Sequence, residues 1–230
     1  MRYSLILLDA DGTLLDYDAA ERSALRRAFS DFGLPYGERA EEEYRRINGR
    51  YWLLYENGEV DARTLQVERF HSLIAALGAG PADADALNET YLGYLAQGSF
   101  LLPGALEVCR ALSARKALAI VTNGFTRTQR GRILNSALSG CISHLIISEE
   151  AGAAKPDPRY FEYALKMIGH PCKTDVLMVG DSLTADIRGG NACGIDTCWL
   201  NPARAANGTG IEPDYEIASL GELPAIAMAE

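Results

Sequence analysis

The sequence lacks paired cysteines and long apolar runs, and each absence excludes a class of protein. Its five cysteines are scattered and form no CxxC pair, which argues against a metal knuckle or a redox pair and favours reduced thiols. No stretch approaches the roughly 18 apolar residues of a membrane span. The apolar run before Asp9 is too short for a signal peptide. We therefore expect a cytoplasmic protein that does not enter the membrane.

Basic charge is also scarce. The 230 residues include 22 Lys and Arg against 31 Asp and Glu, which gives a formal net charge of −9. A general nucleic-acid surface needs a basic patch, so a nucleic-acid polymer is not an expected partner. A small phosphorylated substrate stays possible, because a bound cation can reverse the local field. Hydrophobic residues make up 48% of the chain, which is enough for a sizeable core.

Four short apolar runs, each followed by polar residues, are the most informative feature that is present. They cover residues 5–8, 117–121, 145–147 and 176–179. Buried parallel strands read as continuous apolar runs, and open α/β sheets bind ligands beyond the carboxyl ends of their strands. We therefore expect the polar residues after these four runs to meet at one site.

The chain predicts an α/β core that is interrupted by a helical insertion. Strand and helix patterns alternate after about residue 101 and end in a fifth strand over residues 196–200, which predicts a parallel sheet with helices on both faces. The tract between the first two strands shows only helical periodicity. We expect a Rossmann-like, three-layer parallel sheet core formed by residues 1–16 and 96–230. Residues 17–95 are expected to form an inserted helical bundle.

The first polar motif is Asp9-Ala10-Asp11-Gly12-Thr13. One of its two carboxylates can act as a nucleophile on phosphorus, and the other can give the leaving oxygen a proton. Gly12 permits a tight turn that exposes both acids, and Thr13 can donate its hydroxyl to a phosphate oxygen. The alternative is an Asp-Gly turn with capping aspartates.

Hydrogen-bond donors follow the second and third apolar runs. Thr122, Asn123 and Gly124 offer hydroxyl, amide and backbone N–H groups that suit the oxygens of a phosphoryl group, although the same residues also fit a plain β-turn. Lys155 precedes Pro156, which keeps the loop extended. A lysine fixed in this way can neutralise both a carboxylate nucleophile and a phosphate; the alternative is a solvated surface lysine.

Two acids, Asp181 and Asp186, surround the start of a helix after the fourth run. Mg²⁺ is a hard cation that one or two carboxylates hold together with waters and substrate phosphate. Asp181 fits as a direct ligand, and Asp186 as a ligand or as an acid that orients a water. Helix N-capping is the alternative for both. A carboxylate of Asp9 more than about 10 Å from Asp181 would exclude a shared ion.

Taken together, these motifs resemble the four ordered motifs of the haloacid dehalogenase (HAD) superfamily: Asp9-x-Asp11-Gly12-Thr13, Thr122, Lys155-Pro156, and Gly180-Asp181-x-x-x-x-Asp186. The helical insertion is similar to the C1 cap of some members. The resemblance implies that Asp9 attacks phosphorus to form an aspartyl-phosphate. It also implies that Asp11 protonates the leaving alkoxide and then activates water. Mg²⁺ would be held by Asp9, the carbonyl of Asp11, and Asp181.

A narrower resemblance is to the pyrimidine 5′-nucleotidases of the YjjG/YfnB type, which act on nucleoside monophosphates such as dUMP, UMP and dTMP. It is carried by residues 57–59, 68–70, 120–125 and 147–152. This resemblance implies a nucleoside monophosphate as the small-molecule partner. Trp52, Tyr55 and Arg69 are then candidates to stack on a base or to contact a ribose. Phe70 fits the apolar stripe of a helix core instead.

Three other functions stay open on the sequence. The same chemistry could serve another small phosphate ester, such as phosphoglycolate or a sugar phosphate, because nothing outside the insertion separates these substrates. A haloacid dehalogenase is disfavoured by Asp11, since dehalogenases usually lack an acid there. A non-catalytic binding protein would gain nothing from keeping a nucleophile. The chain is expected to be a monomer or a homodimer.

Overall fold

The computed structural model describes residues 2–56, 58–169 and 172–229. The chain divides into two compact units. The first, here called the α/β unit, runs up to Tyr17 and resumes at Ser99, and the second, the helical unit, spans Asp18–Gly98.

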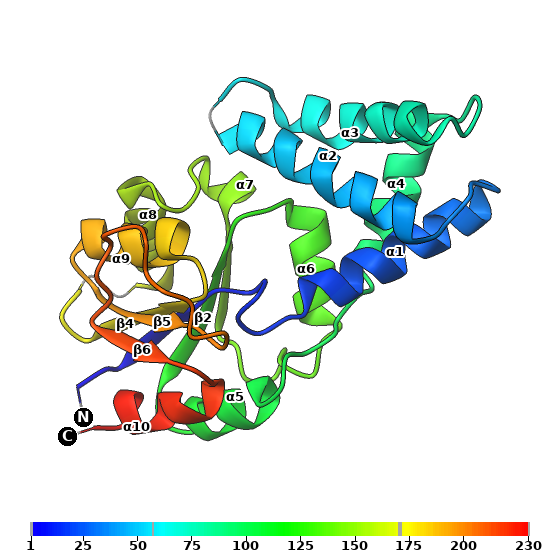
Figure 1. Ribbon diagram of the computed structural model, residues 1–230. Helices are drawn as coiled ribbons and strands as arrows, with labels where there is room; N and C mark the ends of the chain where they lie inside the picture. Colours follow the sequence, from blue (N-terminus) through cyan, green and yellow to red (C-terminus); the bar gives the residue numbers. More distant parts are fainter. Residues whose placement is uncertain (1, 57, 170–171, 230) are drawn as a thin grey trace. The chain divides into compact units, whose positions relative to one another are not determined.

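In the described residues, the α/β unit contains one sheet of six parallel strands in the order β3-β2-β1-β4-β5-β6 (Figure 1). Its strands are β1 (Leu5–Leu8), β2 (Ala117–Thr122), β3 (His144–Ile147), β4 (Val176–Gly180), β5 (Asp196–Leu200) and β6 (Tyr215–Ile217). The predicted parallel sheet is confirmed. Strand β6 was missed, because three residues with a charged one in the middle give no readable apolar run.

Helices cover both faces of this sheet, as predicted, and form a three-layer structure (Figure 1). One face packs against α5 (Ala105–Ser113), α6 (Thr126–Leu134), the 3₁₀ turn η2 (Leu220–Glu222) and α10 (Leu223–Ala227). The other packs against α8 (Pro158–Ile168) and α9 (Arg188–Cys193). The short helix α7 (Ser148–Ala151) follows β3, and the π-helical turn η1 (Leu183–Ile187) precedes α9.

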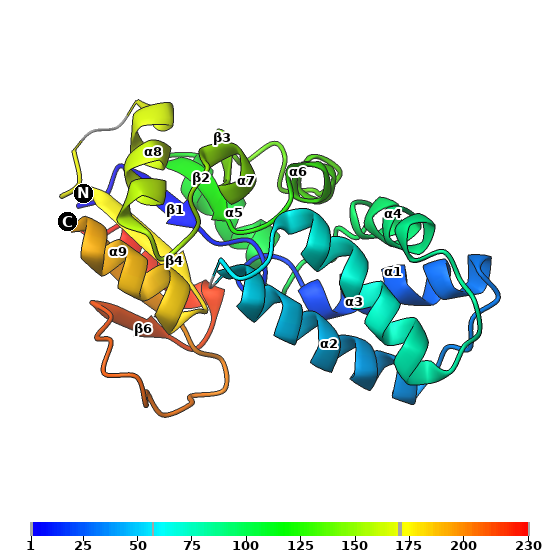
Figure 2. The same ribbon diagram turned by 90° about the horizontal axis from the view of Figure 1, so that it is seen from above.

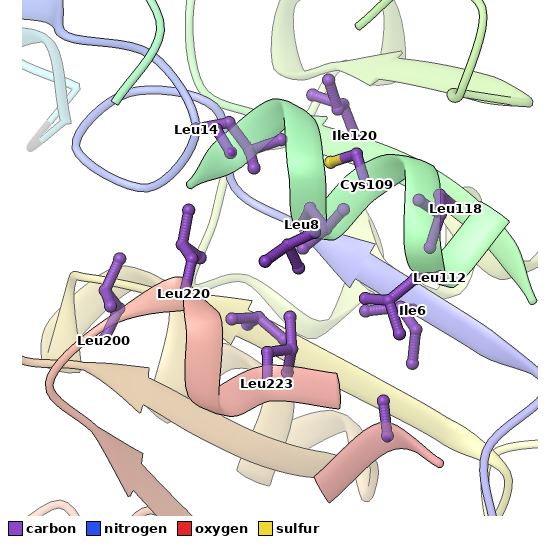
Figure 3. Packing of buried hydrophobic residues seen from close by; sticks show 14 of the residues in the cluster. Ile6, Leu8, Leu14, Cys109, Leu112, Leu118, Ile120, Leu200, Leu220 and Leu223 are labelled. Carbon is purple, nitrogen blue, oxygen red and sulfur yellow. The ribbon is translucent and has the colours of Figure 1, made fainter. Parts of the chain in front are cut away.

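The central strands β1 and β4 contain no polar side chain because both faces of the sheet are buried there. In β1, Ile6 and Leu8 face the layer that contains α5 and α10, where they pack near Leu112 and Leu223 (Figure 3). The alternate residues of β1 belong to the opposite core, under α8 and α9. Burying one leucine side chain stabilises the fold by roughly 1.5–3 kcal/mol. The central strand is therefore held firmly where it delivers Asp9 to the edge of the sheet.

Local sequence signals set the ends of α8. The Asp157 side chain accepts a hydrogen bond from the backbone N–H of Arg159 at 2.9 Å, with proline in the first helical turn. Gly169 ends the helix in the left-handed conformation, at φ +73°. Aspartate before the helix, proline in its first turn and glycine after its last residue are typical of these positions.

The helical unit is built from four helices in the described residues: α1 (Tyr17–Asp31, whose first residue belongs to the α/β unit), α2 (Glu38–Glu56), α3 (Ala62–Leu77) and α4 (Ala84–Leu95). Helix α3 packs against both α2 and α4 (Figure 2). Phe70 is fully buried, as predicted, with its ring centroid 5.6 Å from that of Tyr44 and 5.2 Å from that of Tyr91. In the described part of the chain, no helix combines the length and the apolar character needed to cross a membrane.

Arg69 belongs to this core, which corrects its expected role in contacting substrate. Its side chain is buried, and it donates to Asn48 Oδ1 at 2.8 Å and to Asn88 Oδ1 at 3.3 Å. The guanidinium carbon lies 5.2 Å from the ring centroid of Tyr91. A buried guanidinium persists only where hydrogen bonds replace its water. Arg69 therefore ties three helices of the unit together.

The other two expected substrate contacts are at the end of α2. Trp52 and Tyr55 are partly exposed and meet edge to face, with ring centroids 5.8 Å apart. Asn57, which carried part of the narrower resemblance, lies outside the described residues.

Replacing Arg69 with methionine is expected to lower the free energy of unfolding by about 2–4 kcal/mol, because the Oδ1 atoms of two buried asparagines lose the donor that Arg69 provides. Unfolding in urea, followed by circular dichroism, measures the change. Arg63→Ala is the matched control: this α3 side chain is 82% exposed, so its loss is expected to change stability by less than about 0.5 kcal/mol. Equal stability of the two variants would contradict a structural role for Arg69.

Candidate active site

A pocket of about 220 Å³ lies at the carboxyl edge of the sheet. Strands β2, β1 and β4 are neighbours in the sheet, and parallel strands end at the same edge. The residues that follow them therefore meet, although they are far apart in sequence. The pocket is lined by Asp9, Asp11, Thr122, Asn123, Lys155, Asp181, Ser182, Ala185 and Asp186.

Lys155 is the centre of the charge distribution in this pocket. Its ammonium, buried in the protein, donates to Asp9 Oδ1 at 2.5 Å, to Asp186 Oδ1 at 2.7 Å and to the carbonyl of Val121 at 2.9 Å. The surface-lysine alternative is therefore wrong.

Three carboxylates gather around this single ammonium. Oxygen atoms of Asp9, Asp181 and Asp186 all lie within 4.8 Å of one another, well inside the limit for a shared ion. Lys155 balances one of the three negative charges, so two remain unmatched. A hard divalent cation such as Mg²⁺ fits both this oxygen donor set and this charge.

The pKa values in the pocket reflect burial first and the crowding of its carboxylates second. Burial raises the pKa of Asp9 well above its usual value; the ion pair with Lys155 opposes this rise, and Asp186 adds to it. Burial, aided by Asp186, also raises the pKa of Asp181 to about 6. Burial alone would lower the pKa of Lys155, but Asp186 and Asp9 raise it above its usual value, so the ammonium stays charged. A bound cation would favour the ionised form of both raised carboxyls.

Two glycines allow the carboxylates to approach the backbone closely. At Gly12, where φ is +85°, an added Cβ would lie 2.4 Å from Asp181 Oδ2. At Gly180, an added Cβ would lie 2.2 Å from Asp186 Oδ2. The sequence predicted Gly12 for its turn, but the close approach of the carboxylates is a second reason for glycine at both positions.

Two side chains hold Asp181 in place. The hydroxyl of Thr13 donates to Asp181 Oδ1 at 3.3 Å, and the indole N–H of Trp199 donates to the Asp181 carbonyl at 2.9 Å. Thr13 is fully buried. The Thr13 hydroxyl therefore has a partner inside the protein, and its contact with phosphate stays a prediction.

The three residues of the Thr122-Asn123-Gly124 motif do not all line the pocket. Thr122 and Asn123 line the pocket. The Asn123 amide also clamps the backbone of Lys155: its Nδ2 donates to the Lys155 carbonyl at 3.0 Å, and its Oδ1 accepts from the Lys155 N–H at 2.9 Å. The N–H of Gly124 donates to Ser148 Oγ at 3.0 Å. The N–H of Gly124 therefore has a partner inside the protein, and its contact with phosphate stays a prediction.

Asp186 contributes to the shape of the pocket through both of its carboxylate oxygens. One accepts from Lys155, and the other accepts from the backbone N–H of Ser182 at 3.1 Å. The turn η1 is wide, since the N–H of Ile187 reaches back to the Ser182 carbonyl at 3.2 Å, and such π-helical turns often occur at functional sites. The contacts of Asp186 favour an orienting role over direct ligation of a metal.

Two residues that hold Asp11 were not predicted from the sequence, and both belong to α6. Gln129 donates to Asp11 Oδ2 at 2.7 Å, and Arg132 forms an ion pair with Asp11 Oδ1. Both side chains are buried. A signal was available, because positions three apart on a helix share a face and this helix begins directly after the Thr122 motif.

Comparison with known proteins shows similarity to haloacid dehalogenase-like hydrolases along almost the whole chain. The family model for haloacid dehalogenase-like hydrolases matches residues 3–194. The chain is 36% identical to the pyrimidine 5′-nucleotidase YjjG from Escherichia coli over 97% of both proteins. It is 37% identical to the pyrimidine 5′-nucleotidase PynA from Streptococcus pneumoniae, over 97% of this chain and 94% of that protein. The structure of YfnB from Bacillus subtilis bound to magnesium matches with a TM-score of 0.91, 37% identity and full coverage of both chains.

Mg²⁺ is expected to raise the melting temperature, and to raise it more at pH 7.5 than at pH 5. Without metal, the raised pKa of Asp181 stabilises the fold at low pH, and this contribution is lost as the pH rises through about 6. At pH 5 the cation must displace a proton, whereas at pH 7.5 it meets a carboxylate. Thermal unfolding with and without Mg²⁺ measures the gain, about 2.7 kcal/mol at a concentration 100 times the dissociation constant.

Two variants control this measurement. Asp181→Asn is expected to abolish the Mg²⁺ effect, and Asp157→Asn, at the start of α8, to retain it. An equal gain at both pH values, or a gain that survives in Asp181→Asn, would rule out a metal site at this carboxylate.

Proposed function

The chain belongs to the haloacid dehalogenase-like hydrolase family, and from this premise we propose that it is a Mg²⁺-dependent phosphomonoesterase. Its proposed substrates are pyrimidine nucleoside monophosphates such as dUMP, UMP and dTMP. The observation that carries the chemistry is the placement of Asp9: a buried carboxylate gripped by Lys155 in a pocket that Asp11 also lines.

Asp9 is the proposed nucleophile. Lys155 binds Oδ1 and thereby fixes the carboxylate, so Oδ2 is the oxygen assigned to attack phosphorus. The P–O bond to the ester oxygen breaks as the bond to Asp9 forms, and Asp11 gives its proton to the leaving alkoxide. Asp11 then takes a proton from the water that attacks the aspartyl-phosphate. The P–O bond to Asp9 breaks and inorganic phosphate leaves, so that Asp9 is again a carboxylate and Asp11 is again protonated.

Mg²⁺ would be held by Asp9 and Asp181, with the Asp11 carbonyl as the further ligand that the family resemblance implies. When bound, it supplies positive charge that offsets the charge of the phosphoryl group. Phosphate monoester hydrolysis can require accelerations up to ~10²¹, close to ~29 kcal/mol. Orientation of the reacting groups can supply ~7–11 kcal/mol of this, so covalent catalysis, proton transfer and charge neutralisation must supply the rest.

The proposed nucleotide specificity is supported by the relatives and by the helical unit. Two relatives of nearly equal length are named as pyrimidine 5′-nucleotidases. In the helical unit, Trp52 and Tyr55 present a partly exposed aromatic pair, and aromatic faces stack readily on nucleobases. We propose these two residues as base contacts. Asp11 argues against dehalogenation, since that chemistry has no leaving alkoxide to protonate.

A panel of phosphate esters, assayed with Mg²⁺ and then with EDTA, tests this proposal. We expect kcat/KM for dUMP, UMP and dTMP to exceed that for phosphoglycolate and sugar phosphates by roughly 10-fold or more, and EDTA to abolish all turnover. Equal rates on sugar phosphates would remove the nucleotide specificity and leave the phosphatase. Halide release from a haloacid, unaffected by EDTA, would replace the phosphatase with a dehalogenase.

Asp9→Asn is expected to lower kcat by a factor on the order of 10⁴ or more, because the covalent route is lost. Phosphate release measures turnover, and mass spectrometry of acid-quenched protein detects the aspartyl-phosphate, which should appear in the wild type alone. Asp85→Asn, a change at an exposed carboxylate of the helical unit, should behave as wild type. Undiminished turnover of Asp9→Asn would refute the mechanism.

A further inference from the structure

Helix α6 holds both oxygens of the Asp11 carboxylate. Arg132 forms an ion pair with Oδ1, and Gln129 Nε2 donates to Oδ2 at 2.7 Å. The two residues also contact each other, since Arg132 donates to Gln129 Oε1 at 3.2 Å. We propose that Arg132 and Gln129 are positioning residues that aim Asp11 for its proton transfers. This inference rests on the proposed phosphatase function.

Gln129 links Asp11 to the end of strand β2. The same Nε2 that donates to Asp11 lies 3.0 Å from Thr122 Oγ1 and 3.4 Å from the Asn123 carbonyl. An added Cβ at Gly124 would lie 3.0 Å from this nitrogen, so the glycine gives the amide its space. Gln129 therefore fixes the position of Asp11 relative to the end of β2, where Thr122 lines the pocket.

Arg132 is itself firmly held. Its side chain is fully buried, and its backbone carbonyl accepts the hydroxyl of Ser99 at 2.8 Å. The guanidinium carbon lies 5.4 Å from the ring centroid of Tyr17, a distance at which a cation is attracted to an aromatic face. The backbone of Arg132 is held by Ser99, and its buried guanidinium is held against the ring of Tyr17. The guanidinium therefore has little freedom, and it holds the Asp11 carboxylate in one orientation.

The contacts from Arg132 and Gln129 leave Asp11 able to react. A carboxylate offers about four lone-pair positions, and α6 occupies one on each oxygen. The side chain of Asp11 remains 24% exposed and lines the pocket. Its remaining positions are therefore available to carry the proton that Asp11 gives to the leaving alkoxide and, afterwards, to accept a proton from a water. Because general acid–base catalysis contributes about 10²–10⁴-fold and depends on geometry, loss of this orientation should remove a large part of that factor.

Esters with different leaving groups can show whether Arg132 positions the acid Asp11 or only stabilises the fold. The alkoxide that leaves dUMP needs a proton, whereas 2,4-dinitrophenolate leaves without one. For both esters, kcat/KM reports phosphoryl transfer to Asp9 and not the later attack of water. We expect Arg132→Met to lower kcat/KM for dUMP by about 10–100-fold, and to lower it for 2,4-dinitrophenyl phosphate by less than about 3-fold.

A double-mutant cycle with Asp11→Asn tests whether the effect passes through Asp11. In the Asp11→Asn background, Arg132→Met should cause no further loss on dUMP. Arg130→Met is the matched control, because Arg130 lies on the same helix but forms a partly exposed ion pair with Glu150. It should leave both rates unchanged. Melting temperatures of all variants confirm folding, and Arg132→Lys and Gln129→Met replace Arg132→Met if that variant does not fold.

The outcomes distinguish the two claims. Equal losses on both esters, an unchanged or higher rate on dUMP, or a loss that persists beside Asp11→Asn would overturn the positioning role and leave the phosphatase intact. If the wild type hydrolyses neither ester, the proposed function fails and the positioning role fails with it.

Discussion

The ion pairs of Lys155 with Asp9 and Asp186 are the interactions on which the site depends. Removing each of these charges from water costs several kcal/mol, and the short contacts of the ammonium with both carboxylates offset that cost. Asp181 adds a third carboxylate within the same small volume. The arrangement leaves negative charge unmatched, so it favours a divalent cation and, through that cation, an anionic phosphoryl group.

The rest of the α/β unit serves to hold this charged cluster rigidly. The central strands are buried on both faces, so their ends are fixed by packing on two sides. Gly12 and Gly180 remove the side chains that would separate the acids. Asn123 then fixes the backbone of Lys155 from the neighbouring strand. The pocket is preorganised by structure that makes no contact with substrate, which is how electrostatic stabilisation is obtained without reorganisation during the reaction.

Several residues chosen from the sequence have hydrogen-bond partners inside the protein. Thr13 and Gly124 use their donors inside the protein, on Asp181 and Ser148. Arg69, whose charge suggested a ligand contact, satisfies that charge within the helical unit. In each case the sequence identified a residue with a suitable donor, but the fold decided which acceptor lies close enough to bind that donor. Polar groups that become buried must find such partners, and sequence spacing does not reveal which ones.

The sequence by itself determined the parallel sheet, its first five strands and the identity of the acids and the lysine, because apolar runs and turn residues act over short stretches of chain. Only the tertiary structure decided which oxygens Lys155 binds, that Gln129 and Arg132 grip Asp11, and that Arg69 is buried. Those contacts join residues whose separation in space depends on how helices cross the sheet. No local pattern encodes that distance, so only the packed chain could fix it.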